Sequence, residues 1–251
     1  MFITGASSGI GAALAAHYAA AGARLGLVAR RAPALDEVAR RLPGAPALYA
    51  ADVADAAAMR AAGLDFMARF GVPDIVIANA GVSVGTLTEH FEDIAALSRV
   101  LQTNVAGIAA TFQPFIVPMR QARRGRLVGI ASVAGARGIP GAGAYSASKA
   151  AAITYLEALR IELRGSGVKV VTVSPGYVAT PMTAANPYRM PFILPADAAA
   201  RRIARVIDAG RAHAVVPWQM AVVARLMRLL PNALYDRMFR RAGRKPRGLE
   251  L

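Results

Sequence analysis

The sequence predicts an α/β fold in which helices cover both faces of a doubly wound parallel sheet. Short apolar runs alternate with segments rich in alanine, leucine and arginine along most of the 251 residues, and this alternation is typical of parallel sheets. The runs are continuously apolar, as at positions 75–77, which indicates strands buried on both faces. No repeat or linker interrupts the pattern, so we expect a single domain.

The expected elements follow one another in order. A first short strand ends at Phe2 and Ile3, and strand-like runs follow at 24–29, 47–49, 74–78, 126–131, 169–173 and 214–216. Helix-like segments occupy 9–21, 34–42, 56–69, 91–119, 145–164 and 195–209. The interval 181–195 breaks this rhythm with four prolines among apolar residues, which predicts a loop or lid over a pocket. Residues 1–217 are expected to form the main body, and 218–251 a basic extension of the same domain.

Composition excludes several classes of site and location. The absence of cysteine excludes disulfides, iron–sulfur clusters and zinc held by cysteine. The three histidines are far apart in sequence and lack metal-ligand spacing, so we expect no metal. No apolar run reaches the 18 residues expected of a membrane span. We expect a cytoplasmic location, and the abrupt start at Phe2 leaves open whether residues precede Met1.

The formal net charge is +15, from 30 basic and 15 acidic residues. Two interpretations of this charge are open. One is a coding bias toward alanine and arginine, and the other is an anionic partner such as a membrane surface, a phosphorylated ligand or a nucleic acid. The charge is concentrated at the end of the chain, because residues 196–251 hold 12 basic and 4 acidic residues.

A glycine-rich turn lies between the first apolar run and the first helix-like segment. It reads Thr-Gly-Ala-Ser-Ser-Gly-Ile-Gly over positions 4–11. Glycines permit a tight turn and a close approach of the backbone to a pyrophosphate, and the N-terminus of the next helix attracts the negative charge. The strand–turn–helix context therefore favours a dinucleotide site over an ordinary turn.

Tyr145 and Lys149 are four residues apart in a helix-like segment. Such a spacing places the phenol and the ammonium on one helix face, where the cation lowers the phenol pKa and suits it for proton transfer. The spacing alone is modest evidence, because seven tyrosines and three lysines give roughly 0.1 such pairs by chance. A surface pair is the alternative.

Three further features accompany this pair. Ser132 ends the strand-like run 126–131, Asn104 lies in the long helix-like segment, and Pro-Gly-Tyr-Val-Ala-Thr at 175–180 follows another strand-like run. Strand ends are where open parallel sheets bind their ligands. With these residues the chain resembles the short-chain dehydrogenase/reductase family, in its common subgroup of about 250 residues, from the start to about Pro217. The resemblance implies a Rossmann fold.

The resemblance also assigns roles residue by residue. Asn104, Ser132, Tyr145 and Lys149 match the catalytic tetrad. Ala78 stands where the family has the first Asn of its Asn-Asn-Ala-Gly segment, a departure that we expect to affect strand bracing and not the chemistry. The implied cofactor-binding residues are Gly5, Ser7, Ser8, Gly9, Ile10, Gly11, Asp52, Val53, Asn79, Ala80, Gly81, Tyr145, Lys149, Pro175, Gly176, Val178 and Thr180.

The implied activity is hydride transfer between a nicotinamide cofactor and a carbonyl carbon. Tyr145 would give a proton to the carbonyl oxygen, Ser132 would hydrogen-bond the same oxygen, and Lys149 would lower the pKa of Tyr145. Asn104 would hold a water that resupplies the proton. The apolar lid favours an apolar ketone, aldehyde or acyl-type substrate. A cofactor-binding scaffold or redox-sensing interaction protein without turnover is the alternative, which the complete tetrad disfavours.

Charge at the end of the second strand bears on the choice of cofactor. An acidic residue there suits the ribose hydroxyl of NAD, whereas an arginine accommodates the 2′-phosphate of NADP. Arg30 and Arg31 occupy this place, with no carboxylate before Asp36. We therefore expect NADP(H) to be preferred over NAD(H), unless both arginines are merely solvated loop residues.

The C-terminal extension joins an apolar helical pattern to a basic tail. Val222, Val223, Leu226, Met227 and Leu230 recur at helical spacing, and the tail carries Arg237, Arg240, Arg241, Arg244, Lys245 and Arg247. Such a segment packs over the substrate pocket, packs against a second subunit or lies on an anionic membrane. A nucleic acid is the least favoured partner of this segment. Members of the family often form dimers and tetramers, so the resemblance implies a homodimer or homotetramer formed through the helices at 91–119 and 145–164.

Overall fold

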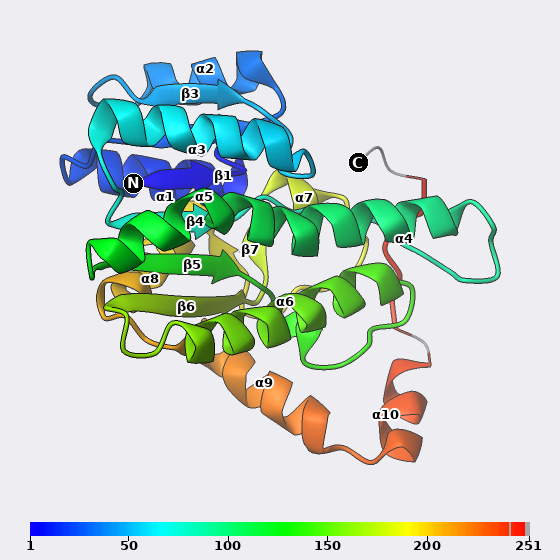
Figure 1. Ribbon diagram of the computed structural model, residues 1–251. Coiled ribbons are helices and arrows are strands. Elements are labelled where there is room, and N and C mark those ends of the chain that lie inside the picture. The colour runs from blue at the N-terminus through cyan, green and yellow to red at the C-terminus, as the bar shows by residue number, and fades with distance from the viewer. Residues whose placement is uncertain (241, 249–251) are drawn as a thin grey trace.

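The computed structural model describes residues 1–240 and 242–248. Within these residues, seven parallel strands form one sheet in the order β3-β2-β1-β4-β5-β6-β9 (Figure 1). The expected doubly wound, Rossmann-type fold is therefore confirmed. The strands are β1 (Phe2–Thr4), β2 (Gly26–Ala29), β3 (Ala47–Ala50), β4 (Ile75–Ala78), β5 (Gly125–Ile130), β6 (Val168–Pro175) and β9 (His213–Val216), and β7 (Val178–Ala179) pairs separately with β8 (Leu194–Pro195).

Helices connect the strands and cover both faces of the sheet (Figure 1). They are α1 (Gly9–Ala20), α2 (Ala32–Arg40), α3 (Ala56–Phe70), α4 (Asp93–Leu101), α5 (Gly107–Gln121), α6 (Gly143–Glu162), α7 (Pro181–Ala184), α8 (Ala196–Asp208), α9 (Trp218–Leu229) and α10 (Asn232–Phe239).

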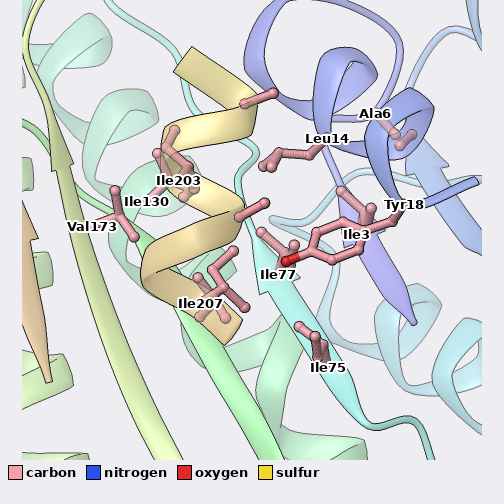
Figure 2. Close-up of a cluster of buried hydrophobic side chains, with 14 of the residues drawn as sticks. Ile3, Ala6, Leu14, Tyr18, Ile75, Ile77, Ile130, Val173, Ile203 and Ile207 are labelled. Atoms are coloured by element: carbon pink, nitrogen blue, oxygen red, sulfur yellow. The ribbon is translucent and has the colours of Figure 1, made fainter. Parts of the chain in front are cut away.

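The two faces of the sheet bury separate hydrophobic clusters. On one face, Ile3 and Ile77 of the central strands pack against Leu14 of α1 and Ile203 of α8 (Figure 2). On the other face, α3, α5 and α6 supply the apolar side chains, and the ring of Phe115 lies 4.9 Å from that of Phe2. Because β1, β2 and β4 are buried along their whole length, the unbroken apolar runs of the sequence correspond to strands covered on both sides.

β1 lies at the point where the strand order reverses, with β2 on one side and β4 on the other. In an open parallel sheet this point leaves a crevice beyond the carboxyl ends of the strands. The glycine-rich turn after β1 and the residues that follow β4, β5 and β6 therefore meet at one edge.

The segment at 91–119 differs in detail from the single helix that we expected. α4 and α5 are joined by a π-helical stretch, Gln102–Ala106. The helical run is therefore continuous but has one wider turn, which contains Asn104. Within the described residues, the run Asp93–Gln121 is the one helix long and apolar enough to cross a membrane by composition. Half of its apolar window is buried inside the fold.

The expectation left three positions open for the C-terminal stripe: over the substrate pocket, against a second subunit or on an anionic membrane. In the structure Val222 and Leu226 are exposed, and the buried residue of α9 is Met220. Met220 packs against Gly176, which lacks a side chain at this contact. Met220 is thus the fully buried residue of α9, and the other apolar residues of this helix are half-buried or exposed.

Candidate active site

Asn79 ties the ends of β1 and β4 together. Its side-chain amide donates hydrogen bonds to the carbonyl oxygens of Thr4 and Gly5 at 3.0 and 3.1 Å, and its backbone N–H donates to the hydroxyl of Thr4 at 3.1 Å. These bonds brace the strand ends although Ala78 replaces the family's first asparagine. The expected effect of Ala78 on the bracing of these strands stays a prediction.

The glycine-rich turn depends on two close backbone approaches. Gly5 has a φ of +65°, and a Cβ there would lie 2.7 Å from the Cα of Ala80. At Gly11 a Cβ would lie 2.2 Å from the carbonyl oxygen of Gly5. Side chains are excluded at both positions, so the glycines let α1 begin directly behind the turn.

The N-terminus of α1 is suited to an anion. Ser8 occupies the N-cap position, but its side chain makes no capping hydrogen bond, so the first N–H groups of the helix are left for another acceptor. These groups and the helix dipole attract a phosphate. The chemistry of this turn therefore fits the pyrophosphate of a dinucleotide.

A cavity of about 560 Å³ opens beside this turn. It runs from the ends of β2 and β3 past β4 to the ends of β5 and β6. Of the expected site residues, the cavity is lined by Gly5, Ser7, Ser8, Gly9, Ile10, Arg30, Arg31, Asp52, Val53, Asn79, Ala80, Gly81, Ser132, Tyr145, Lys149, Pro175, Gly176, Val178 and Thr180.

Gly11 and Asn104 do not line the cavity, because Gly11 packs behind the turn and Asn104 is fully buried. The sequence did not identify several other lining residues, although most are direct chain neighbours of expected ones at strand ends. These are Val28, Ala29, Ala51, Val82, Thr103, Ile130 and Ala131. Three more lining residues, Pro181, Met182 and Thr183, belong to the segment that was expected to form a lid.

Tyr145 and Ser132 meet in the wall of the cavity. Ser132 follows β5, where its hydroxyl accepts a hydrogen bond from Ala134 N–H at 3.1 Å and so caps a short 3₁₀ turn. Burial raises the pKa of the Tyr145 phenol above its usual value, and a hydrogen bond from Ser132 offsets this only in part. The expectation that the pKa of Tyr145 is lowered is therefore wrong for this arrangement, and the phenol stays protonated at neutral pH.

Lys149 is held at the end of β5 with little exposure to solvent. Its ammonium donates to the carbonyl oxygen of Ile130 at 2.8 Å and lies 5.8 Å from the centre of the Tyr145 ring. Burial lowers the pKa of Lys149 to about 8, because the charged form loses its hydration. The ammonium is thus fixed beside the phenol at the cost of desolvation.

Asn104 uses its side chain to join two elements. The amide oxygen accepts from Val82 N–H at 2.8 Å, and the amide nitrogen donates to the Val82 carbonyl and to the Ser148 hydroxyl, each at 2.9 Å. Asn104 therefore holds the loop after β4 against α6, which carries Tyr145 and Lys149. Its expected role in holding a water stays a prediction.

Asp52 and the two arginines lie at the far end of the cavity. The carboxylate of Asp52 accepts from Ala54 N–H at 2.9 Å and pairs with Arg99 at 2.5 Å. Burial raises the pKa of this carboxyl, but the hydrogen bonds and the nearby guanidinium groups outweigh burial and hold the pKa below its usual value. Asp52 is the one carboxylate among the described lining residues, and Arg30 and Arg31 line the same end.

The end of the chain lies across the loops around the cavity. We call residues 242–248 the C-terminal strap. Gly85 N–H donates to the Pro246 carbonyl at 2.9 Å, and the Lys245 ammonium donates to the Met182 carbonyl at 3.0 Å. Arg247 binds Asp93 through two hydrogen bonds of 2.7 and 3.2 Å.

These contacts decide part of the open question about the basic tail. Lys245 and Arg247 bind the body of the protein, with Lys245 buried and Arg247 paired, so neither is available as a free cation for a membrane. Arg241 lies outside the described residues. The strap packs beside the expected lid, since the backbone at Gly243 lies directly against the side chain of Tyr188.

Comparison with known proteins agrees with this geometry. The family model described as short chain dehydrogenase matches residues 1–189. The chain belongs to this family. It is an oxidoreductase family with a nicotinamide dinucleotide cofactor, and the matched range contains the glycine-rich turn, Tyr145 and Lys149.

Relatives match nearly the whole chain. An uncharacterized oxidoreductase of Myxococcus xanthus is 40% identical over 244 residues, which are 95% of each protein. Among solved structures, a 3-ketoacyl-ACP reductase from Sinorhizobium meliloti has a TM-score of 0.76 at 28% identity, covering 86% of this chain and 96% of that one. An alcohol dehydrogenase from Thermococcus sibiricus, complexed with 5-hydroxy-NADP, also has a TM-score of 0.76, at 25% identity over 86% and 94% of the two chains.

We predict that Lys149→Met stabilises the cofactor-free short-chain dehydrogenase at pH 7 by about 1–3 kcal/mol. The pKa of Lys149 is lower in the folded protein than in the unfolded chain, where it is 10.5. The charge therefore costs stability below about pH 8, and the cost disappears as pH rises toward 10.5. Urea unfolding at a series of pH values measures the gap between variant and wild type.

The matched control is Lys169→Met, since Lys169 is exposed on β6; it should change the free energy of unfolding by less than about 0.5 kcal/mol. Destabilisation by Lys149→Met that does not vary with pH contradicts the prediction.

We predict that Arg247→Ala loosens the strap without weakening cofactor binding. The amide of Gly85, which donates to the strap, should exchange its hydrogen about tenfold faster. Hydrogen exchange with mass spectrometry measures this, and the control is Arg201→Ala, which removes an exposed ion pair with Asp197 on α8. Unchanged exchange at Gly85 shows that the pair with Asp93 does not hold the strap.

Proposed function

We propose that this short-chain dehydrogenase is an NADPH-dependent reductase of apolar ketones, aldehydes or acyl-type carbonyls, interconverting C=O and CH–OH. The observation that carries the proposal is the meeting of Ser132, Tyr145 and Lys149 in the wall of a cavity that also contains a phosphate-binding turn. Bound in this cavity, a nicotinamide dinucleotide supplies or accepts the hydride.

Tyr145 is suited to give a proton. Its raised pKa keeps the phenol protonated at neutral pH, so its hydroxyl is able to donate to the oxygen of a carbonyl substrate as negative charge develops there. Ser132, already hydrogen-bonded to Tyr145, holds the same oxygen in place. The ammonium of Lys149 stabilises negative charge on the phenol after the proton has left.

The lid beside the cavity contains aromatic and apolar residues. The rings of Tyr177 and Tyr188 lie 6.5 Å apart, edge to face, and Met182 lines the cavity directly. The other apolar residues of the lid are Met190, Phe192, Ile193 and Leu194. An apolar carbonyl compound suits this composition, and the printed names of the two structural relatives, an alcohol dehydrogenase and a ketoacyl reductase, support the same reaction type.

Arg30 and Arg31 support the preference for NADPH. Both line the end of the cavity beyond β2, and its one described carboxylate, Asp52, is engaged by Arg99. A guanidinium group binds a phosphate through paired hydrogen bonds, whereas no carboxylate that could bind a ribose hydroxyl lies between β2 and Asp36. The complex of the Thermococcus enzyme with 5-hydroxy-NADP is a further support.

Self-association and location are part of the proposal. Val117 of α5 and Ile161 of α6 are more than half exposed, which supports a homodimer or homotetramer formed through these helices. The cytoplasmic location stays a prediction.

We predict that Tyr145→Phe lowers the turnover of NADPH with a responsive aldehyde or ketone by about 10²–10⁴-fold, because the proton donor is lost. The measurement is NADPH consumption against carbonyl compounds graded from short diketones to long-chain acyl carbonyls. NADPH affinity, followed by its fluorescence, should fall by less than about tenfold, because at most one hydrogen bond to the cofactor is lost. Tyr155→Phe, farther along α6, is the control and should keep wild-type turnover.

Full activity in Tyr145→Phe contradicts the assigned role. A wild-type protein that binds NADPH tightly but turns over none of the panel favours the scaffold alternative over the reductase.

We predict that the double variant Arg30→Ala, Arg31→Ala weakens NADPH binding by about 10–100-fold, because the 2′-phosphate loses its charged partners. NADH binding should change by less than about threefold, since NADH lacks that phosphate. Dissociation constants of both cofactors measure the effect, with Arg40→Ala on α2 as control. Equal losses for both cofactors, or tighter binding of NADH by the wild type, contradict the preference.

A further inference from the structure

α9 and α10 extend away from the sheet at one end of the molecule (Figure 1). Each buries one side chain fully, Met220 in α9 and Tyr235 in α10. Arg137 holds the turn between them, because its guanidinium donates to the carbonyls of Met227 and Leu230 and stacks 3.9 Å from the centre of the Tyr235 ring. The two helices are therefore fixed in place while most of their surface remains uncovered.

The uncovered surface of α9 is an apolar stripe. Trp218, Val222, Leu226 and Leu229 are 70, 49, 59 and 74% exposed, and their spacing of four, four and three residues places them on one helix face. On α10, Leu234 and Met238 are four residues apart and 46 and 60% exposed. We call these six residues the apolar face. Exposed large apolar side chains gathered on two neighbouring helices are unusual on a soluble monomer and mark an interaction surface.

The charges beside the apolar face have one sign. Arg225 and Arg228 lie on α9, and Arg237 and Arg240 on or directly after α10, while residues 218–240 contain one acid, Asp236. In the described part of the chain, none of these four arginines has a carboxylate within ion-pair distance. Arg237 and Arg240 also line one groove with Arg244.

We propose that the apolar face and its arginines form a peripheral docking surface for an anionic lipid bilayer. Exposed tryptophan and leucine beside arginine are the side chains that bind at the boundary between headgroups and acyl chains, and each arginine adds attraction to anionic lipid. A second copy of the chain fits less well, because it would bring the same positive charges together with almost no acid to pair them. Docking needs no assumption about the reaction, so its test is independent of the proposed function.

Trp218 is the only tryptophan in the chain and reports directly on this surface. The full-length protein is titrated with vesicles of phosphatidylcholine alone and with vesicles containing phosphatidylglycerol. We expect the fluorescence of Trp218 to move to shorter wavelength on the anionic vesicles, as the side chain leaves water. Binding should weaken at least about tenfold when salt is raised from 50 to 500 mM, because screening removes the contribution of the arginines.

The variant Leu226→Glu, Leu229→Glu tests the apolar face itself. It should lower the affinity for anionic vesicles at least about tenfold, with no change in NADPH affinity or in the midpoint of urea unfolding. The matched control is Leu64→Glu, since Leu64 is 48% exposed on α3, and it should bind vesicles as wild type does.

Three results would overturn the proposal. One is the absence of a fluorescence shift with anionic vesicles. Another is equal binding to neutral and anionic vesicles at every salt concentration. The third is a shift that appears on raising protein concentration without vesicles, which identifies the surface as a contact between copies of this chain.

Discussion

The hydrogen bonds from Asn79 to the carbonyl oxygens of Thr4 and Gly5 set the separation between the ends of β1 and β4, and the site depends on that separation. Gly5 and Gly11 allow the strand ends and the turn to come this close, because backbone atoms fill the space that a Cβ would need at either position. The N-terminus of α1 consequently opens into the cavity without a side-chain cap. The close approach of the ends of β1 and β4 therefore creates the position at the N-terminus of α1 that suits a phosphate.

Burial of charged and titratable groups is the second condition on the site. Lys149 and Tyr145 are both shifted toward their neutral forms by lost hydration, and at neutral pH the buried charge of Lys149 costs folding free energy. Asn104 counteracts this cost by fixing the loop after β4 to α6 through three hydrogen bonds. The π-helical stretch that contains Asn104 lets its amide reach both elements, and such insertions in helices are frequent at functional sites.

The C-terminal extension divides its residues between two surfaces. In the strap, Lys245 and Arg247 turn inward and bind groups beside the cavity. In α9 and α10, the large apolar side chains and the arginines remain outward. A single basic segment thus contributes both to the surroundings of the cavity and to an exposed surface, and Arg137 holds the turn between the two helices of that exposed surface.

The alternation of strands and helices and the glycine-rich turn by themselves determined the doubly wound fold, and local motifs identified most of the residues that line the cavity. These features depend on neighbours in the chain, such as a turn that requires glycine or a strand that must be apolar on both faces.

Tertiary structure decided the properties of the site that depend on residues far apart in the sequence. The pKa of Tyr145 is raised because the phenol is buried among several elements. Asn104 points inward because its amide binds Val82 and Ser148. The helical spacing of Val222 and Leu226 was visible in the sequence, but only the packing of Met220 against Gly176 showed which face of α9 is covered, because periodicity defines a stripe without naming its partner.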